Sequence, residues 1–401
     1  MSPWLRIVGI GEDGLAGLAP SARALVEDAD VLIGGARHLA MVEHLTAEKL
    51  GWESPLKATV ARIEGYRGRA VTVLASGDPM AYGVGVTLMR RFAPEEVVCL
   101  PGIGAFSLAC ARLGWPLAEC VTLTAHGRPL DLVRQHLIPG NRLLILSEDG
   151  RTPAALATLL REAGFGPSVM IVLSHMGGDR ETRLETTAAE GVAGDVPDLN
   201  TVAVEVRAAP GTPLFSRVPG LADEAFRHDG QMTKREVRAV TLAALAPVPG
   251  GLLWDIGAGC GSVAIEWMRA ADRARAIAVE RNAERRAMTA ENASMLGAPQ
   301  LRIVAGEAPA ALDGLEEPHA VFVGGGLSAA GVMERAWQAL ASGGRLVANA
   351  VTLEGEAVLM AWHRDHGGSL TRLAVSRAEP IGPYEGWRPL MPVTQLALVK
   401  P

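Results

Sequence analysis

A glycine-rich loop in the second half of the chain restricts the possible folds more than any other feature. The segment WDIGAGCGS (residues 254–262) follows a hydrophobic strand pattern and leads into the helical pattern SVAIEWM. Gly257, Gly259 and Gly261 keep the loop free of Cβ atoms, so a ligand can approach the backbone and the amino terminus of the helix. We therefore expect a Rossmann-like sheet with a ligand at the carboxyl end of this strand.

The residues around the loop indicate which ligand it binds. Glu280 ends the next predicted strand, where a carboxylate can accept both hydroxyls of an adenosine ribose. The glycine spacing is G-x-G-x-G, whereas nicotinamide sites have G-x-G-x-x-G. Asp255 precedes the loop, and a third strand leads into AGEAPAAL (residues 305–312), which suits the adenine. These features favour S-adenosylmethionine over NAD.

This segment resembles the class I methyltransferases. The resemblance implies a methyl-donor site formed by Thr233, Gly257, Gly259, Gly261, Glu280, Glu307 and Ala308. A dinucleotide-binding or ligand-free Rossmann sheet is the alternative that the loop alone leaves open.

The second half carries the strand count of such a methyltransferase. Seven strands are predicted, at residues 252–256, 276–279, 301–304, 320–323, 345–349, 370–375 and 395–399. Helical patterns fill the gaps except between the last two strands. The domain opens with a predicted helix over 233–245, with Thr233 as its cap and Glu236 completing a capping box.

The first half also alternates strands with helices. Its predicted strands lie at residues 5–10, 71–76, 97–100, 121–124, 142–146, 169–174, 182–187 and 201–206. Helical patterns follow several of them, as at residues 105–113 and 153–163. The alternation predicts a largely parallel α/β sheet, and the last strands, which follow one another without a helix, predict an antiparallel portion.

Three glycine loops in the first half point to a second ligand site. GIGEDG (residues 9–14) formally matches a dinucleotide fingerprint, but the second strand ends in VLIGGARH, without the acidic ribose ligand. ASGDPMAYGVG (residues 75–85) and LPGIGAFSLACARLGWP (residues 100–116) each leave a buried strand through a turn. Together the three loops resemble the class III, or tetrapyrrole, methylases from Leu5 to Val206.

In that family the methyl donor lies folded in a cleft between two α/β lobes and is held mostly by backbone. The resemblance implies that the donor meets Gly9, Gly11, Ser76, Gly77, Asp78, Gly104 and Ala105. The chain is therefore expected to bind two S-adenosylmethionine molecules. The proposed domains are 1–207 and 231–401, joined by a linker at 208–230 that contains three prolines and no sustained periodicity.

Further motifs narrow the resemblance to enzymes of the corrin (vitamin B12) pathway. GGARHL (residues 34–39) and LTAHGR (residues 123–128) are similar to the methylases that act on precorrins, and residues 226–239 and 279–297 resemble their usual partner domain. The resemblance implies methylation of carbons 5 and 15 of precorrin-6B and decarboxylation of the ring C acetate, giving precorrin-8. It assigns carbon 5 to the first domain, and carbon 15 with the decarboxylation to the second.

The chemistry demands positioning more than an activated side chain. Methyl transfer to an electron-rich ring carbon is an in-line displacement, so no catalytic residue and no metal site are predicted. The substrate carries many carboxylates, which basic residues can bind by charge-assisted hydrogen bonds. The candidates are Arg37, His38, His126, Arg128, Lys234, Arg235, Arg238 and Arg281. For each one, a solvated surface charge is the alternative.

Charge and composition exclude several other classes. The net charge is −6, whereas proteins that bind nucleic acid usually have a basic face. An RNA methyltransferase is nevertheless an alternative, because both folds also occur in enzymes that modify RNA. A sensor of S-adenosylmethionine is a second alternative, disfavoured by two complete donor sites. The first residues lack the charged and apolar pattern of a signal peptide, and no apolar run is long enough for a membrane helix, so we expect a cytoplasmic enzyme. The four cysteines are too scattered for disulfides or zinc. Self-association is expected from the resemblance.

Overall fold

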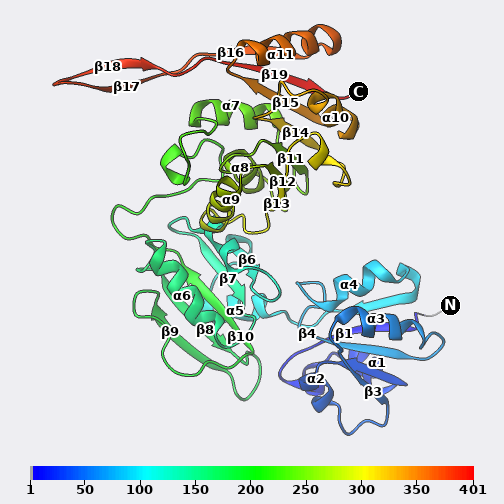
Figure 1. Cartoon of the computed structure of the whole chain (residues 1–401). Helices are drawn as coiled ribbons and strands as arrows, with labels where there is room; N and C mark the ends of the chain where they lie inside the picture. Colours follow the sequence, from blue (N-terminus) through cyan, green and yellow to red (C-terminus); the bar gives the residue numbers. More distant parts are fainter. Residues whose placement is uncertain (1–2) are drawn as a thin grey trace. The chain divides into compact units, whose positions relative to one another are not determined.

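A computed structural model describes residues 3–401 of the chain (Figure 1). It divides into two compact units, the first extending to Leu130 and continuing over Ile138–Pro213, the second comprising Asp131–Leu137 and Leu214–Pro401. Both units are mixed α/β, which confirms the predicted fold class. Among the described residues, no helix is long and apolar enough to cross a membrane.

The first lobe of unit one is a parallel sheet of five strands in the order β3-β2-β4-β1-β5. The strands are β1 (Leu5–Ile10), β2 (Val31–Gly34), β3 (Glu48–Gly51), β4 (Val71–Ser76) and β5 (Val97–Leu100). Helices α1 (Pro20–Glu27) and α2 (Ala36–Met41) pack on one face, and α3 (Leu56–Glu64) and α4 (Val84–Arg91) on the other. The loops after β1, β4 and β5 therefore lie at one edge.

The second lobe of unit one has a mixed sheet in the order β6-β7-β10-β8-β9. Its strands are β6 (Cys120–Thr124), β7 (Arg142–Leu146), β8 (Val169–Ser174), β9 (Thr182–Thr187) and β10 (Asn200–Glu205), with helices α5 (Ala105–Leu113) and α6 (Thr152–Glu162). Only β6 and β7 pair in parallel, so the predicted antiparallel portion is confirmed.

Unit two contains a seven-stranded sheet in the order β13-β12-β11-β14-β15-β19-β16. The strands are β11 (Leu252–Ile256), β12 (Arg275–Glu280), β13 (Arg302–Ala305), β14 (Ala320–Val323), β15 (Arg345–Ala350), β16 (Ser369–Leu373) and β19 (Val393–Val399). β19 runs antiparallel to both of its neighbours, β15 and β16, and the other pairings are parallel. Helices α7 (Arg235–Leu245), α8 (Ser262–Ala270) and α9 (Ala283–Met295) cover one face; α10 (Val332–Ala339) and α11 (Leu353–His366) cover the other.

A β-hairpin that the sequence did not predict lies between β16 and β19. Its strands, β17 (Ser376–Ile381) and β18 (Tyr384–Pro389), form a separate two-stranded sheet. Figure 1 shows the hairpin extending beyond β16. Its side chains are mostly exposed, and the half-buried positions of β17 carry charged residues, so no buried apolar face marks these strands in the sequence.

The segment after Leu214 packs onto unit two although it falls within the predicted linker. Leu221 and Phe226 are buried in the core that α7 and α8 share. The Glu266 carboxylate on α8 accepts hydrogen bonds from the backbone N–H groups of Gly220 at 2.6 Å and Leu221 at 3.1 Å. We therefore place the domain boundary at Pro213, with residues 214–230 as part of the second domain.

Two truncations test this boundary. A fragment of residues 214–401 is expected to unfold cooperatively, whereas one of residues 231–401 loses two buried apolar side chains at about 2–5 kcal/mol each. It also loses Asp223, a partner of the buried Arg238, which adds about 3–5 kcal/mol. The shorter fragment should therefore be molten or unfolded by circular dichroism and calorimetry. Equal stability of the two fragments would contradict this boundary.

Candidate functional site

A cavity of about 860 Å³ lies in unit two at the carboxyl ends of β11, β12 and β14. Many of the predicted site residues line it, namely Thr233, Lys234, Gly257, Gly259, Glu280, Arg281, Glu307 and Ala308. Gly261 lies beside it as the residue that precedes α8. These predicted residues therefore share one cavity, and which of them touch a ligand stays a prediction.

The three loop glycines serve different purposes. All have left-handed backbone, with φ of 71° at Gly257, 60° at Gly259 and 79° at Gly261. A Cβ on Gly257 would lie 2.7 Å from the Cα of Gly325, and one on Gly261 would lie 2.6 Å from a methyl group of Thr289. A Cβ on Gly259 would have no atom closer than 3.5 Å. Gly257 and Gly261 thus allow the loop to pack, while Gly259 leaves open space beside the cavity.

Two carboxyl groups line the cavity next to this loop. Glu280 accepts hydrogen bonds from the backbone N–H groups of Gly259 and Asn282, both at 2.9 Å, which fixes the loop. Asp255 accepts one from the N–H of Ala264 at 3.0 Å, but its buried Oδ1 has no partner. Burial raises the pKa of Asp255 to about 7, and the nearby Glu280 charge adds to this. The unpaired Oδ1 can accept a hydrogen bond from a ligand or lie against a positively charged part of it.

The cavity also has three basic residues, Lys234, Arg281 and Arg285, and the two arginines form ion pairs. Arg281 binds Glu307 at 2.9 Å, and both side chains are largely exposed. Arg285, which the sequence analysis missed, binds Asp229 at 2.8 Å. Arg285 lies in the first turn of α9, which follows β12. A charged residue at such a position has no distinctive signal in the sequence.

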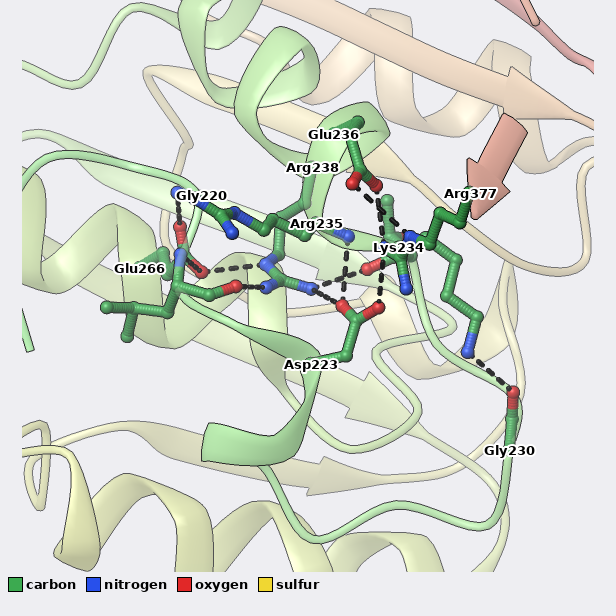
Figure 2. Close-up of polar contacts among 11 residues, drawn as sticks. Gly220, Asp223, Gly230, Lys234, Arg235, Glu236, Arg238, Glu266 and Arg377 are labelled. Atoms are coloured by element: carbon green, nitrogen blue, oxygen red, sulfur yellow. Dashed lines mark hydrogen bonds and ion pairs between the residues drawn. The ribbon is translucent and has the colours of Figure 1, made fainter. Parts of the chain in front are cut away.

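Arg238 and Arg235 do not reach the cavity, which corrects their interpretation as substrate anchors. Arg238 is fully buried, and its guanidinium donates to Glu266, Asp223 and the backbone carbonyls of Leu221 and Thr233 (Figure 2). All three nitrogens of the Arg238 guanidinium therefore donate to protein groups. Arg235 is exposed on α7, and only its backbone N–H makes a described contact, to Asp223 at 2.9 Å.

The predicted capping box at the start of α7 is wrong. The helix begins at Arg235 with Lys234 as the N-cap, and no side chain caps it. Glu236 instead accepts hydrogen bonds from Arg377 on β17 (Figure 2). A residue so distant in the sequence cannot be recognised as a competing partner from local spacing.

In unit one the three predicted glycine loops meet. A Cβ on Gly9 would overlap the carbonyl oxygen of Gly77 and the nitrogen of Gly102. One on Gly77, which has φ of 53°, would lie 2.8 Å from the carbonyl oxygen of Ile103. Gly104 precedes the first residue of α5, Ala105. The loops after β1, β4 and β5 therefore form one continuous backbone surface.

Two other predicted donor-site residues have local roles in their loops. Asp78 accepts a hydrogen bond from the backbone N–H of Met80 at 2.8 Å, which shapes the turn after β4. A Cβ on Gly11 would lie 2.7 Å from a carboxylate oxygen of Asp13. Neither contact involves a ligand, so their part in donor binding stays a prediction.

A cluster of charged residues stands next to these loops. The Arg37 guanidinium donates to Glu12 and, at 2.7 Å, to the hydroxyl of Ser76, which His38 also contacts at 3.0 Å. Glu12 and His175 were missed by the sequence analysis. The carboxylate of Glu12 lies 2.7 Å from Nδ1 of His175, which follows β8 in the second lobe. Glu12 thus joins the two lobes of unit one.

Electrostatics in this cluster follow from burial and from Arg37. Burial, reinforced by the Arg37 charge, lowers the pKa of His38 to about 4. Burial acts to raise the pKa of Glu12, but His175 and Arg37 lower it below its usual value. His38 is therefore neutral and Glu12 ionised near pH 7.

The remaining two candidates in unit one, His126 and Arg128, are exposed in the loop after β6. The guanidinium carbon of Arg128 lies 5.1 Å from the ring centroid of Tyr82, and the Tyr82 hydroxyl donates to the carbonyl of Thr122 at 2.9 Å. Tyr82 belongs to the loop after β4, so these contacts place Arg128 beside the predicted donor loops.

Comparisons with known proteins identify the family. The Tetrapyrrole (Corrin/Porphyrin) Methylases match residues 5–191, and the Precorrin methyltransferase domain matches residues 224–400. The precorrin-6Y C(5,15)-methyltransferase (decarboxylating) of Sinorhizobium sp is 52% identical over 401 residues, covering 100% of this chain and 97% of that protein. The chain belongs to the precorrin-6Y C(5,15)-methyltransferase family.

Two relatives match only part of the chain. The cobalt-precorrin-7 C(5)-methyltransferase of Salmonella typhimurium is 29% identical over 201 residues, which are 50% of this chain and 98% of that protein. A probable cobalt-precorrin-6B C(15)-methyltransferase (decarboxylating) of Pyrobaculum calidifontis is 36% identical over 182 residues, 44% of this chain and 93% of that protein.

Membership of the precorrin-6Y C(5,15)-methyltransferase family makes the chain an S-adenosylmethionine-dependent methyltransferase of corrin biosynthesis. It sets aside both the RNA methyltransferase and the sensor alternatives. Among residues 3–401, no group of histidine, cysteine, aspartate and glutamate side chains could hold a metal ion.

The pKa of His38 predicts how the stability of unit one depends on pH. Because this pKa is depressed in the folded state, its contribution is present above the unfolded value near 6.5 and is lost as pH falls towards about 4. The loss amounts to roughly 3 kcal/mol over that window. His38→Gln should abolish this part of the acid destabilisation in calorimetry of the full chain, whereas His126→Gln, at an exposed histidine, should not. Parallel curves for wild type and His38→Gln would contradict the assignment.

Proposed function

We propose that this chain methylates carbons 5 and 15 of precorrin-6B and decarboxylates the ring C acetate, with one donor site in each unit. The observation that supports two sites is that each unit has its own set of glycine loops at the carboxyl ends of parallel strands. The half-length relatives, named for carbon 5 and for carbon 15 with decarboxylation, support a division of labour between the domains.

In unit two, S-adenosylmethionine fits the residues that line the cavity. The loop at Gly259 leaves space against the backbone. The Glu280 carboxylate, which accepts a hydrogen bond from this loop, can also accept hydrogen bonds from the ribose hydroxyls. The unpaired Oδ1 of Asp255 suits a positively charged part of the donor. Glu307 and Ala308 lie where the adenine of a class I site is expected.

In unit one the donor would be held mostly by backbone. At Gly9 and Gly77 no side chain fits between the loops, and at Gly104 a Cβ would lie 3.3 Å from the Cβ of Asp78, so main-chain groups dominate this surface. Ser76 stands between these loops and Arg37, so donor and substrate groups would meet there. We assign carbon 5 to this site, and carbon 15 with the decarboxylation to unit two.

The chemistry requires alignment rather than a nucleophilic side chain. S-adenosylmethionine supplies an electrophilic methyl group, and the electron-rich ring carbon attacks it in line as the carbon–sulfur bond breaks. The residues of each site hold the two reactants and exclude water. Arg37, Arg128, Lys234 and Arg281 are assigned to the carboxylates of the tetrapyrrole. Self-association, a cytoplasmic location and the absence of a nucleic-acid partner stay predictions.

The proposed reaction is tested by incubating the full chain with precorrin-6B and S-adenosylmethionine. Mass spectrometry should show a product with two added methyl groups and one CO2 lost. A product with the two methyl groups and no loss of CO2, or with one methyl group only, would contradict the proposed bifunctional activity.

The number of donor sites is tested by Gly259→Val. The valine side chain occupies the space next to the cavity and strains a backbone with φ of 60°, so carbon 15 methylation and one donor site should be lost. Titration calorimetry with S-adenosylhomocysteine should give two sites for wild type and one for the variant. Gly250→Val, at φ of 74° with no neighbour within 4 Å and outside the cavity, controls for backbone strain. A variant that still binds two molecules would refute the placement of this site.

A further inference from the structure

One wall of the cavity in unit two is formed by a segment outside the Rossmann-like sheet. The arm segment (residues 374–392) runs from the end of β16 through the β17–β18 hairpin to β19. Val375, Pro389, Leu390 and Met391 of this segment line the cavity. The hairpin itself has little packing of its own, because Tyr384 and Trp387 are both more than three-quarters exposed, at 77% and 78%.

Arg377 attaches the arm segment to the rest of the unit. It lies near the start of β17, two residues from Val375 in the cavity wall. Its guanidinium donates to Asp223 at 2.9 Å and to Glu236 at 2.6 Å and 3.3 Å (Figure 2). Charge-assisted hydrogen bonds to two carboxylates are among the strongest polar contacts that a protein can form.

The carboxylates that receive Arg377 are themselves held in place. Asp223 is buried and accepts from the backbone N–H of Arg235 and from the guanidinium of Arg238. Arg238 in turn donates to Glu266 at 2.7 Å, and both side chains are fully buried. Figure 2 shows Asp223 between Arg238 and Arg377. Arg377 is therefore fixed to a rigid network that includes the start of α7, whose neighbours Thr233 and Lys234 also line the cavity.

A second arginine of the hairpin provides a contrast. Arg388 pairs with Glu379 at 2.9 Å, but their side chains are 73% and 43% exposed, and both lie on the hairpin. Such a surface pair contributes little and does not connect the hairpin to the rest of the unit.

We propose that Arg377 is a positioning residue that holds the arm segment as an apolar wall against which the tetrapyrrole macrocycle binds. The glycine loop, Asp255 and Glu280 provide the donor side of the cavity, on the sheet edge. Val375, Leu390 and Met391 provide an apolar surface suited to the flat conjugated ring. The cavity volume, about 860 Å³, lies near the upper end of the range for ligand sites, which leaves room for part of a second reactant. This inference rests on the function proposed for unit two.

Arg377→Gln in the full chain tests the role of this residue. The KM for the tetrapyrrole in carbon 15 methylation and in CO2 release should rise by about tenfold or more, because the wall is no longer held in place. The dissociation constant of S-adenosylhomocysteine at the second site should change by less than about twofold, and carbon 5 methylation in unit one should be unchanged. Arg377→Lys should restore part of the loss, and Arg388→Gln should behave as wild type.

Three results would overturn the proposal in an enzyme whose wild type methylates carbon 15. The first is an unchanged tetrapyrrole KM in Arg377→Gln. The second is a loss of S-adenosylhomocysteine binding as large as the loss of tetrapyrrole binding. The third is an effect of Arg388→Gln as large as that of Arg377→Gln. A fall of kcat with unchanged KM and a lowered unfolding temperature, without rescue by lysine, would show a structural role only and also overturn it. A wild-type enzyme that does not methylate carbon 15 would instead refute the proposed function itself.

Discussion

Close approach of backbone to backbone at the carboxyl ends of parallel strands is the constraint on which both units depend. In unit one Gly9, Gly77 and Gly102 meet with no room for a Cβ atom, and in unit two Gly257 meets Gly325 in the same way. Two unrelated sheets thus bring main-chain groups close together at these edges. This arrangement suits a reaction in which alignment of two reactants contributes more than an activated side chain.

Buried charges then fix the elements that surround these edges. In unit two the pair Arg238–Glu266 ties residues 220–223 to α8, and its burial is compensated because all three nitrogens of the Arg238 guanidinium donate to protein groups. In unit one Glu12 performs a comparable task, since it contacts Arg37 in the first lobe and His175 in the second. Such networks contribute less to net stability than to a single defined geometry, which is what the ligand edges require.

The sequence could predict features that depend on local pattern. Strand periodicity and glycine spacing predicted most strands of the larger sheets and several of the residues that line the cavity, because these signals arise within a few residues of one another. It could not identify the role of Arg238, since a basic residue near a donor loop looks the same whether it faces a substrate or a buried Glu266. It also misassigned Glu236, whose partner Arg377 is distant in the chain, and missed the hairpin, whose exposed strands bury no apolar face.

Two of the four basic residues assigned to the substrate carboxylates, Arg281 and Arg37, are already neutralised by neighbouring carboxylates. Arg281 pairs with Glu307 and Arg37 with Glu12, and Arg285, in the same cavity as Arg281, pairs with Asp229. At these arginines an anion must therefore replace a carboxylate partner rather than enter an empty positive site. A ligand with one negative charge gains little from such an exchange, because it breaks one ion pair to form another. A tetrapyrrole with several carboxylates can replace several carboxylate partners at once, while it loses its translational freedom only once. The free energies of its ion pairs therefore add up, whereas a small anion forms only one such pair. The paired arginines thus favour the large polycarboxylate over the small metabolite anions of the cell, although the chain as a whole carries a net charge of −6.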